Sequence, residues 1–461
     1  MSSLYKLFNR SYRDYVGDAE TLRLLNIIVL SVAVGMFLFS AQGGVAFVGY
    51  ASALGAGEFA FGLISALPVL ASLLQIPASY LVEKTGKYKT VFLVNGVIQR
   101  ISWIVIAFIP FLFPVEESYL WALVILVTLA AMCGSFLAIT HTTLLASVIP
   151  MEARGRYITT RQKVMTACGM VVGLFIALIL DYVPGFTGYT IVFAVGGVAG
   201  LIDILMYASV SFSGIPRKPK QYSIFSSIKS SIASPKTRNY FIFWMFWSLA
   251  INLSVPFFNK YAIDVLLLSY VSMIFFGQIV SQLLALFVLS TWGRFLDRYG
   301  SVPMMMISAT VATLGISVWL FASPGSVWVI FLFNFIGGLF WCANEACMVN
   351  MQISHTPSEG RPAALAVYAV LTSIAAATSF IIGGFLLETL SPIMENLNFT
   401  FMGTHFDHYK VLFSITIVAR LIVIFIFLPR VWNEKEISIS KTLTKVISDS
   451  KFKINWVLKG R

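Results

Sequence analysis

Charged side chains occur inside several long apolar stretches of this sequence, where each would lie in hydrocarbon if the stretch crosses a membrane. A charge in that setting costs free energy, so it needs an ion-pair partner, a water-filled cavity or a function. A carboxylate that faces such a cavity can bind and release a proton during a functional cycle. The residues concerned are Arg100, Asp203, Glu345 and Arg420, with His141 and His355 nearer the ends of their stretches.

The composition indicates a membrane protein. Of 461 residues, 58% are hydrophobic and 11% are charged, and the mean hydropathy is +0.85. A soluble domain has about a quarter charged residues, so this chain lacks the polar surface that water would require. The alternating segments of about ten residues that build a membrane β-barrel do not occur.

Twelve apolar stretches are long enough to cross a bilayer as helices, which predicts an all-α polytopic membrane protein. They fall into two sets of six, 22–213 and 239–430, separated by a basic, proline-containing cytoplasmic linker at 214–238. A cytoplasmic segment at 1–21 precedes them and a basic cytoplasmic tail at 431–461 follows. The predicted spans are 22–50, 61–82, 90–113, 119–149, 157–180, 190–211, 240–265, 269–292, 302–321, 327–353, 363–390 and 409–428.

The positive charge lies on one side of the predicted membrane. All but Arg100, Lys260, Lys410 and Arg420 of the 32 Lys and Arg residues fall in segments on that side. This asymmetry predicts a multi-pass protein of the plasma (inner) membrane with both termini in the cytoplasm. It also argues against nucleic acid as the reason for the net charge of +12.

Two charged loops repeat in register between the halves of the chain. The first reads Glu-Lys-Thr-Gly at 83–86, the second reads Asp-Arg-Tyr-Gly at 297–300, and acid, base and glycine recur at one offset. A Pro-x-Glu-x-Arg element recurs in the same way at 150–154 and 357–361. The two halves of the chain are therefore repeats of each other.

These loops resemble the Gly-x-x-x-Asp-Arg-x-Gly-Arg-Arg signature and the Pro-x-Glu-x-Arg element of the major facilitator superfamily. The second signature copy matches through Gly293, Asp297, Arg298 and Gly300, whereas the first has Ser79 for glycine and Glu83 for aspartate. The resemblance covers the whole chain. The remaining loop residues that it marks are Lys84, Gly86, Lys87, Glu152, Arg154, Glu359 and Arg361.

The resemblance implies two six-helix bundles related by pseudo-two-fold symmetry, which rock about a central site in alternating access. It assigns the charged loops to a cytoplasmic latch. In that latch, Glu83 and Asp297 would accept hydrogen bonds from a helix N-terminus of the opposite bundle, and Arg154 and Arg361 would neutralise them.

The resemblance also suggests how the charges within spans pair. It places spans three and six in one bundle, and Arg100 and Asp203 lie at similar depth, so we expect them to form an ion pair. Glu345 and Arg420 also match in depth, and two alternatives stay open for them. Glu345 either carries a proton in the central cavity, which span ten would line, or forms a static pair with Arg420.

Helix-breaking residues indicate where a substrate would bind. Gly43 and Gly44 interrupt span one, and Pro256 interrupts span seven at nearly the equivalent position. Paired interruptions in corresponding helices of two repeats are typical of transporter binding sites. The polar and aromatic candidates around them are Gln42, His141, Asn252, Asn259, Trp341, Asn344 and Glu345. Each alone is equally well explained by helix packing.

We therefore expect a secondary transporter of a small organic solute, coupled to a proton, with a polar, sugar-like substrate favoured. Efflux of amphipathic drugs or cations by proton antiport is the alternative, and a non-transporting receptor or scaffold is a third class. No enzyme activity, cofactor, metal site or nucleic-acid partner is expected. The partners are the substrate, the coupling ion and the lipid bilayer, and the protein is expected to act as a monomer.

Overall fold

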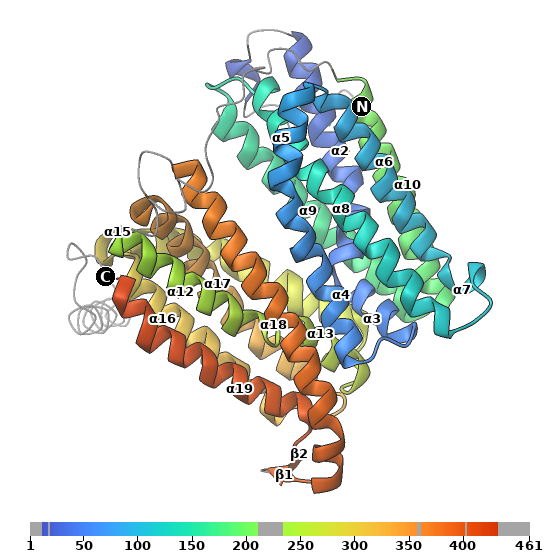
Figure 1. Ribbon diagram of the computed structural model, residues 1–461, viewed down its shortest axis with the longest axis vertical. Helices are drawn as coiled ribbons and strands as arrows, with labels where there is room; N and C mark the ends of the chain where they lie inside the picture. Colours follow the sequence, from blue (N-terminus) through green and yellow to red (C-terminus); the bar gives the residue numbers. More distant parts are fainter. Residues whose placement is uncertain (1–11, 17–18, 211–233, 357–360, 402, 432–461) are drawn as a thin grey trace, which may run out of the picture. The chain divides into compact units, whose positions relative to one another are not determined.

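The computed structural model describes residues 12–16, 19–210, 234–356, 361–401 and 403–431 (Figure 1). Within these residues, twelve helices are long and apolar enough to cross a membrane. The all-α, twelve-span architecture expected from the sequence is therefore confirmed. The basic tail lies outside the described residues apart from Val431, and most of the linker and of the N-terminal segment do so as well.

The helices of the first half follow one another with short connections, and two of the membrane crossings are each built from more than one element. A 3-10 turn over Ser72–Leu74 joins α4 to α5, and a single residue separates α2 from α3. The helices are α2 (Ala19–Gly43), α3 (Val45–Ala53), α4 (Glu58–Ala71), α5 (Gln75–Thr85), α6 (Tyr88–Ala107), α7 (Ile109–Leu112), α8 (Glu117–Val148), α9 (Arg154–Tyr182) and α10 (Phe186–Ala208).

The second half also consists of consecutive helices, and several of them are irregular. A π-helical stretch, Met273–Ile279, lies between α14 and α15, and another, Val423–Phe427, follows α19. Two short strands, β1 (Thr400–Phe401) and β2 (Thr404–His405), pair antiparallel before the last span. The helices are α12 (Pro235–Asn252), α13 (Val255–Asp264), α14 (Tyr270–Ser272), α15 (Val280–Tyr299), α16 (Ser301–Leu314), α17 (Val327–His355), α18 (Arg361–Leu397) and α19 (His408–Ile422).

Local sequence explains several helix ends. Pro235 occupies the first turn of α12, where its missing N–H costs nothing, so this helix begins inside the segment that we assigned to the linker. Asp407 caps α19 by accepting a hydrogen bond from the Lys410 N–H at 3.0 Å. Gly86 ends α5 at φ +67° and Gly300 follows α15 at φ +88°, a left-handed region that favours glycine.

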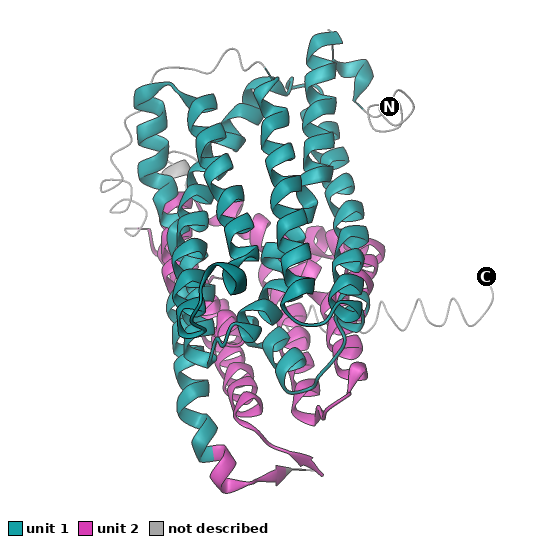
Figure 2. Cartoon of the chain, turned by 90° about the vertical axis from the view of Figure 1, so that its right-hand side faces the viewer, with its two compact units in different colours: residues 1–221, 255–275, 376–393 teal, residues 222–254, 276–375, 394–461 magenta. Residues whose placement is uncertain are grey.

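The chain divides into two compact units (Figure 2). The first comprises residues 1–221, 255–275 and 376–393, and the second comprises 222–254, 276–375 and 394–461. Helices α13 and α14 and part of α18 are thus grouped with the first half of the chain. The division into two six-helix sequence repeats stays a prediction.

In the first unit, helices approach closely where glycines replace larger residues. Helix α10 packs against both α2 and α6, and α6 also packs against α8. A Cβ on Gly197 would lie 2.4 Å from Ile104 Cγ1, and a Cβ on Gly196 would lie 3.4 Å from the Cα of Leu38. Small residues at helix contacts are what close packing in a membrane requires.

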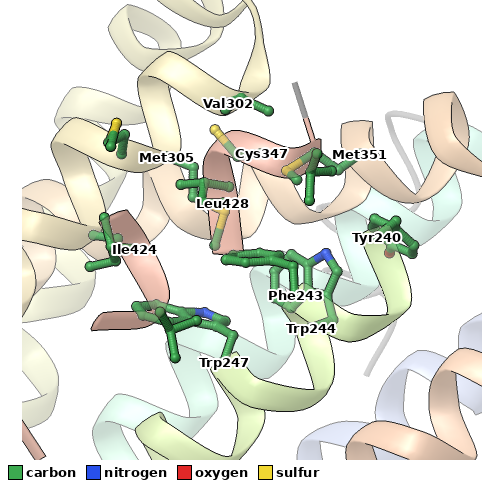
Figure 3. Close-up of a cluster of buried hydrophobic side chains, with 14 of the residues drawn as sticks. Tyr240, Phe243, Trp244, Trp247, Val302, Met305, Cys347, Met351, Ile424 and Leu428 are labelled. Carbon is green, nitrogen blue, oxygen red and sulfur yellow. The ribbon is translucent and has the colours of Figure 1, made fainter. Parts of the chain in front are cut away.

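The second unit has an aromatic and methionine-rich core (Figure 3). Phe243 and Trp247 stack with ring centroids 6.2 Å apart, and Trp247 is 2% exposed. The residues that the figure labels come from the spans Pro235–Asp264, Ser301–Phe321, Val327–His355 and His408–Val431, and they are Tyr240, Phe243, Trp244, Trp247, Val302, Met305, Cys347, Met351, Ile424 and Leu428. Trp247 is therefore a core residue and does not face lipid.

We predict that Trp247→Ala destabilises the protein in detergent, whereas Trp328→Ala, at a site 48% exposed, has little effect. Removal of a large ring from a core costs about 3–5 kcal/mol in water-soluble proteins. The cost here should be somewhat lower, because lipid is nearly as apolar as the core. Thermal unfolding of the two variants measures this, and equal melting temperatures would contradict the packing argument.

Candidate functional site

A cavity of about 290 Å³ lies among the helices of the first unit. Helices α2, α6, α8, α9 and α10 contribute its walls, so it is formed by parts of one compact unit. Its polar lining residues are Gln42, Gln99, Arg100, His141, Arg161, Asp203 and Tyr207, and its apolar lining includes Val32, Phe92, Leu137 and Met165.

Arg100 and Asp203 form the expected ion pair in the wall of this cavity. Arg100 Nη2 donates to Asp203 Oδ2 at 3.1 Å, and the two side chains are 10% and 12% exposed. Arg100 Nη1 also donates to Gln99 Oε1. A carboxylate at this depth is compensated by a guanidinium, which is the arrangement that a low-dielectric interior demands.

Glycines make the space for these polar groups. A Cβ on Gly35 would lie 2.9 Å from Asp203 Oδ2, and a Cβ on Gly200 would lie 2.9 Å from Arg100 Cγ. A Cβ on Gly134 would likewise lie 2.8 Å from Nε2 of Gln99. The polar groups therefore occupy volume that neighbouring helices leave open.

His141 is held beside the ion pair by aromatic residues. Its Nε2 lies 3.0 Å from the Tyr207 hydroxyl oxygen, and its ring stacks on Phe92 at 16° with centroids 5.9 Å apart. Tyr207 in turn packs on Phe92 at 4.9 Å. These contacts fix the orientation of a polar ring that faces the cavity.

A second cavity, of about 420 Å³, shares Gln42, Gln99 and Gly134 with the first. Gln42 is the last residue before the break at Gly43 and Gly44, where α2 ends and α3 begins. The interruption predicted for span one therefore exists and lies beside two cavities. In span seven, α12 ends at Asn252 and α13 begins at Val255, immediately before Pro256.

The remaining polar candidates divide between the units. Asn259 is exposed on α13 in the first unit. In the second unit, the Asn252 side chain donates to Ser248 O at 2.8 Å, and Trp341 is half-buried. Asn344 is 4% exposed and accepts a hydrogen bond from Ser308 Oγ at 3.0 Å, which matches the helix-packing explanation.

Glu345 and Arg420 do not form an ion pair among the described residues. Arg420 is 4% exposed, and its Nη2 donates to the backbone carbonyl oxygen of Ile251 at 3.0 Å. Glu345 is exposed on α17. Matching depth was not sufficient to pair them, because depth does not specify the direction in which each side chain leaves its helix.

The charged loops are partly helical. Glu83 and Lys84 lie in the last turn of α5, and Asp297 and Arg298 lie in that of α15, rather than in open loops. Ser79 donates from Oγ to Ile76 O at 2.8 Å within α5. Of the other marked positions, Lys87 precedes α6 and Glu152 is exposed. Arg154 and Arg361 begin α9 and α18, and Gly293 lies within α15. Glu359 lies outside the described residues.

Lys89, next to the first charged loop, has a structural role. Its Nζ donates to the carbonyl oxygens of Ala208 at 2.7 Å and Val210 at 2.9 Å, at the C-terminus of α10. A cation there satisfies free carbonyl groups and the negative end of the helix dipole. The loop is thereby fixed to α10 of its own unit.

The most extensive polar network of the first unit lies at its opposite end, and the sequence did not predict it. Lys260 on α13 donates from Nζ to Asp264 Oδ2 at 2.6 Å, to Ser52 Oγ at 3.2 Å and to Ala56 O at 3.2 Å. Ser52 donates to Asp264 Oδ2 at 3.0 Å, and Glu58 Oε1 lies 3.9 Å from the Lys260 ammonium. We call Ser52, Glu58, Lys260 and Asp264 the α13 network.

A second contact at this end joins α9 to α14. Asp181 accepts hydrogen bonds from the Tyr270 N–H at 2.8 Å and the Val271 N–H at 2.9 Å. The hydroxyl groups of Tyr189 and Tyr270 lie 2.6 Å apart. The carboxylate thus satisfies N–H groups that the first turn of a helix leaves unpaired.

The backbones of helices α4 and α18 also approach each other closely, at Gly62 and Gly384. A Cβ on Gly62 would lie 2.5 Å from Phe380 O, and a Cβ on Gly384 would lie 2.7 Å from Glu58 O. The Phe59 N–H donates to Glu388 Oε2 at 3.2 Å.

For the α13 network, the sequence contained one usable signal. Lys260 and Asp264 are spaced i, i+4, which places a cation and an acid on the same helix face.

We predict that Asp203→Asn lowers stability in detergent, because it leaves the buried Arg100 charge uncompensated. Breaking a buried pair from one side costs roughly 3–5 kcal/mol. The double variant Arg100→Gln, Asp203→Asn removes both charges and should recover much of that loss. Thermal unfolding of the single and double variants checks this, and a single variant as stable as the parent would refute it.

Comparisons with known proteins agree with this architecture. The Major Facilitator Superfamily sequence model matches residues 28–291 and 239–458. A search of curated proteins by sequence gave no match. Among the described residues, no group of three or more His, Cys, Asp and Glu side chains is placed to hold a metal ion.

Solved transporter structures share the fold at low sequence identity. The nucleoside transporter NupG superposes with a TM-score of 0.66 at 14% identity, over 89% of this chain and 100% of that one. The xylose transporter XylE from E. coli, in an inward open conformation, gives 0.62 at 15% over 91% and 99%. A bacterial homologue of the human lysosomal transporter Spinster gives 0.62 at 13% over 91% and 100%.

The Major Facilitator Superfamily model matches both halves of the chain, and the solved structures cover about nine-tenths of the chain. Twelve apolar helices make the chain a multi-pass integral membrane protein. The chain belongs to the major facilitator superfamily of transporters.

Proposed function

We propose that this protein moves a small polar organic solute across the plasma membrane together with a proton, by alternating access. Both termini face the cytoplasm, the substrate is sugar-like, and the monomer is the working unit. The observation that carries the proposal is the pair of cavities that meet at Gln42 and Gln99 beside the break in α2. Amide groups offer both hydrogen-bond donors and acceptors to hydroxyl groups.

The α13 network and the contact of Asp181 with α14 support the alternating-access part of the proposal. They lie at the end of the first unit that the charge distribution assigns to the cell exterior. A passage that opens to the exterior requires these contacts to break, so they act as an outer latch. In this proposal, the intact contacts correspond to a state that is closed at that end.

Glu345 remains the proposed proton carrier. It is exposed and has no ion-pair partner in the described part of the chain. An acid within a span almost always faces a bundle interior or a water-filled cavity, because contact with lipid costs several kcal/mol. An acid with access to water and no fixed counter-charge can change its protonation state during transport.

Transport in proteoliposomes tests the proposal. Purified protein is reconstituted with a pH-sensitive dye and is supplied in turn with sugars, amino acids and lipophilic cations. Proton movement with a sugar supports the proposal, and proton movement with lipophilic cations supports efflux instead. No movement with any solute would favour a receptor or scaffold, or a different coupling ion.

We predict that Glu345→Gln abolishes solute-driven proton movement in this assay but leaves solute counterflow measurable. The amide keeps the shape of the side chain and loses the titrating proton. Glu116→Gln, which changes an exposed acid outside the spans, should behave like the parent protein. Unchanged coupling in Glu345→Gln would remove this residue from the mechanism.

We predict that Asp264→Asn weakens the outer latch, because it removes the closest contact of the Lys260 ammonium. Ala377 is 1% exposed where α18 meets α4, so a cysteine there reports opening. In a background without the native cysteines, Asp264→Asn should raise the rate at which an impermeant maleimide labels Ala377→Cys several-fold. Glu117→Gln, an exposed acid at the start of α8, is the matched control and should leave the rate unchanged.

A further inference from the structure

The cavity beside the ion pair carries excess positive charge. Its charged lining residues are Arg100, Arg161 and Asp203, so two guanidinium groups face one carboxylate. Within the described residues, no further acid lines this cavity. We propose that the cavity binds one anionic group, a carboxylate or a phosphate, of the transported solute. This inference rests on the proposed transport function and specifies its substrate class.

Unused hydrogen-bond donors support the inference. Arg100 is 8% exposed, and its two terminal nitrogens are occupied by Asp203 and Gln99. Its Nε is buried and has no hydrogen-bond partner among the described residues, and the same holds for Nε of Arg161. A buried donor without a partner costs about 1–3 kcal/mol, more for a charged group, so the protein itself does not fully compensate either guanidinium group.

The surrounding structure is built to keep these groups in place. Gly35, Gly134 and Gly200 leave room for Asp203, Gln99 and Arg100, each of which would collide with a Cβ there. His141 is oriented by Tyr207 and Phe92 and adds a polar ring to the same wall. A volume of about 290 Å³ is near the lower limit of known small-molecule sites, which suits a small solute.

The charge balance decides between classes of solute. An anion neutralises the excess positive charge and accepts hydrogen bonds from the guanidinium groups. Hydrogen bonds between two charged groups are among the strongest in proteins. A lipophilic cation would add a third positive charge to a confined space, where like charges repel strongly. A neutral sugar would fill the space but leave the excess charge uncompensated. An acidic sugar or a comparable organic acid satisfies both the polar lining and the charge.

Ligand-induced thermal stabilisation tests this inference without any transport. The full chain in detergent is mixed with glucose, glucosamine, glucuronate or glucose 6-phosphate at constant ionic strength. These solutes share one ring and differ in charge, and the two acids separate a carboxylate from a phosphate. We expect at least one acid to raise the melting temperature in a concentration-dependent way, with no shift from glucosamine.

Substitution of one arginine locates the effect. Arg161→Gln is the variant of choice because Arg161 is half-buried and stands outside the ion pair, so folding should survive. It should weaken acid binding by roughly ten- to a hundred-fold, the usual loss of a hydrogen bond to a charged group. Lys163→Gln removes an exposed positive charge two residues further along α9 and should bind acids like the parent.

The inference is wrong if neither acid stabilises the protein, if glucose stabilises it as strongly as the acids, or if Arg161→Gln keeps the parent affinity. Counterflow of the same four solutes in proteoliposomes separates this result from the proposed function. Transport of glucose without either acid would retain the function and reject the anion site. Acid binding without transport of any solute would retain the site and reject the function.

Discussion

The cost of a charge without compensation in hydrocarbon is the constraint on which the rest of the structure depends. It explains why Asp203 is bonded to Arg100, why glycines leave space around them, and why Arg420 turns to a backbone carbonyl group when none of the described acids pairs with it. The same constraint makes the exceptions informative. Arg100 and Arg161 line a cavity rather than a sealed core, so a ligand can supply the negative charge that the protein does not.

Most of the fold was predictable, because long apolar stretches and the repeated charged loops identify spans and connections directly. Each of the twelve predicted spans matches one of the described membrane-crossing helices, and most ends agree to within a few residues. The larger differences go in both directions: α15 extends through Asp297 to Tyr299, whereas α6 ends at Ala107, before the predicted end at 113. Hydropathy marks the end of a span where charged residues begin, whereas the helix continues for as long as its backbone hydrogen bonds do. The charged last turns of α5 and α15 were therefore assigned to loops. The break at Gly43 and Gly44 was predictable because glycine rarely continues a helix without cost.

The candidate site was predictable only in part. The Arg100–Asp203 pair followed from depth and from the family arrangement of spans, but the same reasoning failed for Glu345 and Arg420, since the helix face on which a residue lies depends on packing. Arg161 was not singled out, because it lies near the start of a span among other basic residues and looks like part of the cytoplasmic charge. The α13 network was also missed, because it joins residues that are about two hundred positions apart in the chain.

Several bonds at the end of the first unit that contains the α13 network are more exposed than the buried Arg100–Asp203 pair. Asp181 pairs with two N–H groups in an exposed setting, and Ser52 and Asp264 form an exposed hydrogen bond as well. When such bonds separate, water takes the place of each lost partner, so each contributes only about 1.5–3 kcal/mol, the range for a hydrogen bond to a charged group. In the proposed transport cycle, closure at this end rests on several exposed bonds that water can replace one at a time, together with the Lys260–Asp264 ion pair. The proposed alternating access needs contacts of this kind, because a much stronger seal would trap the transporter in a single state.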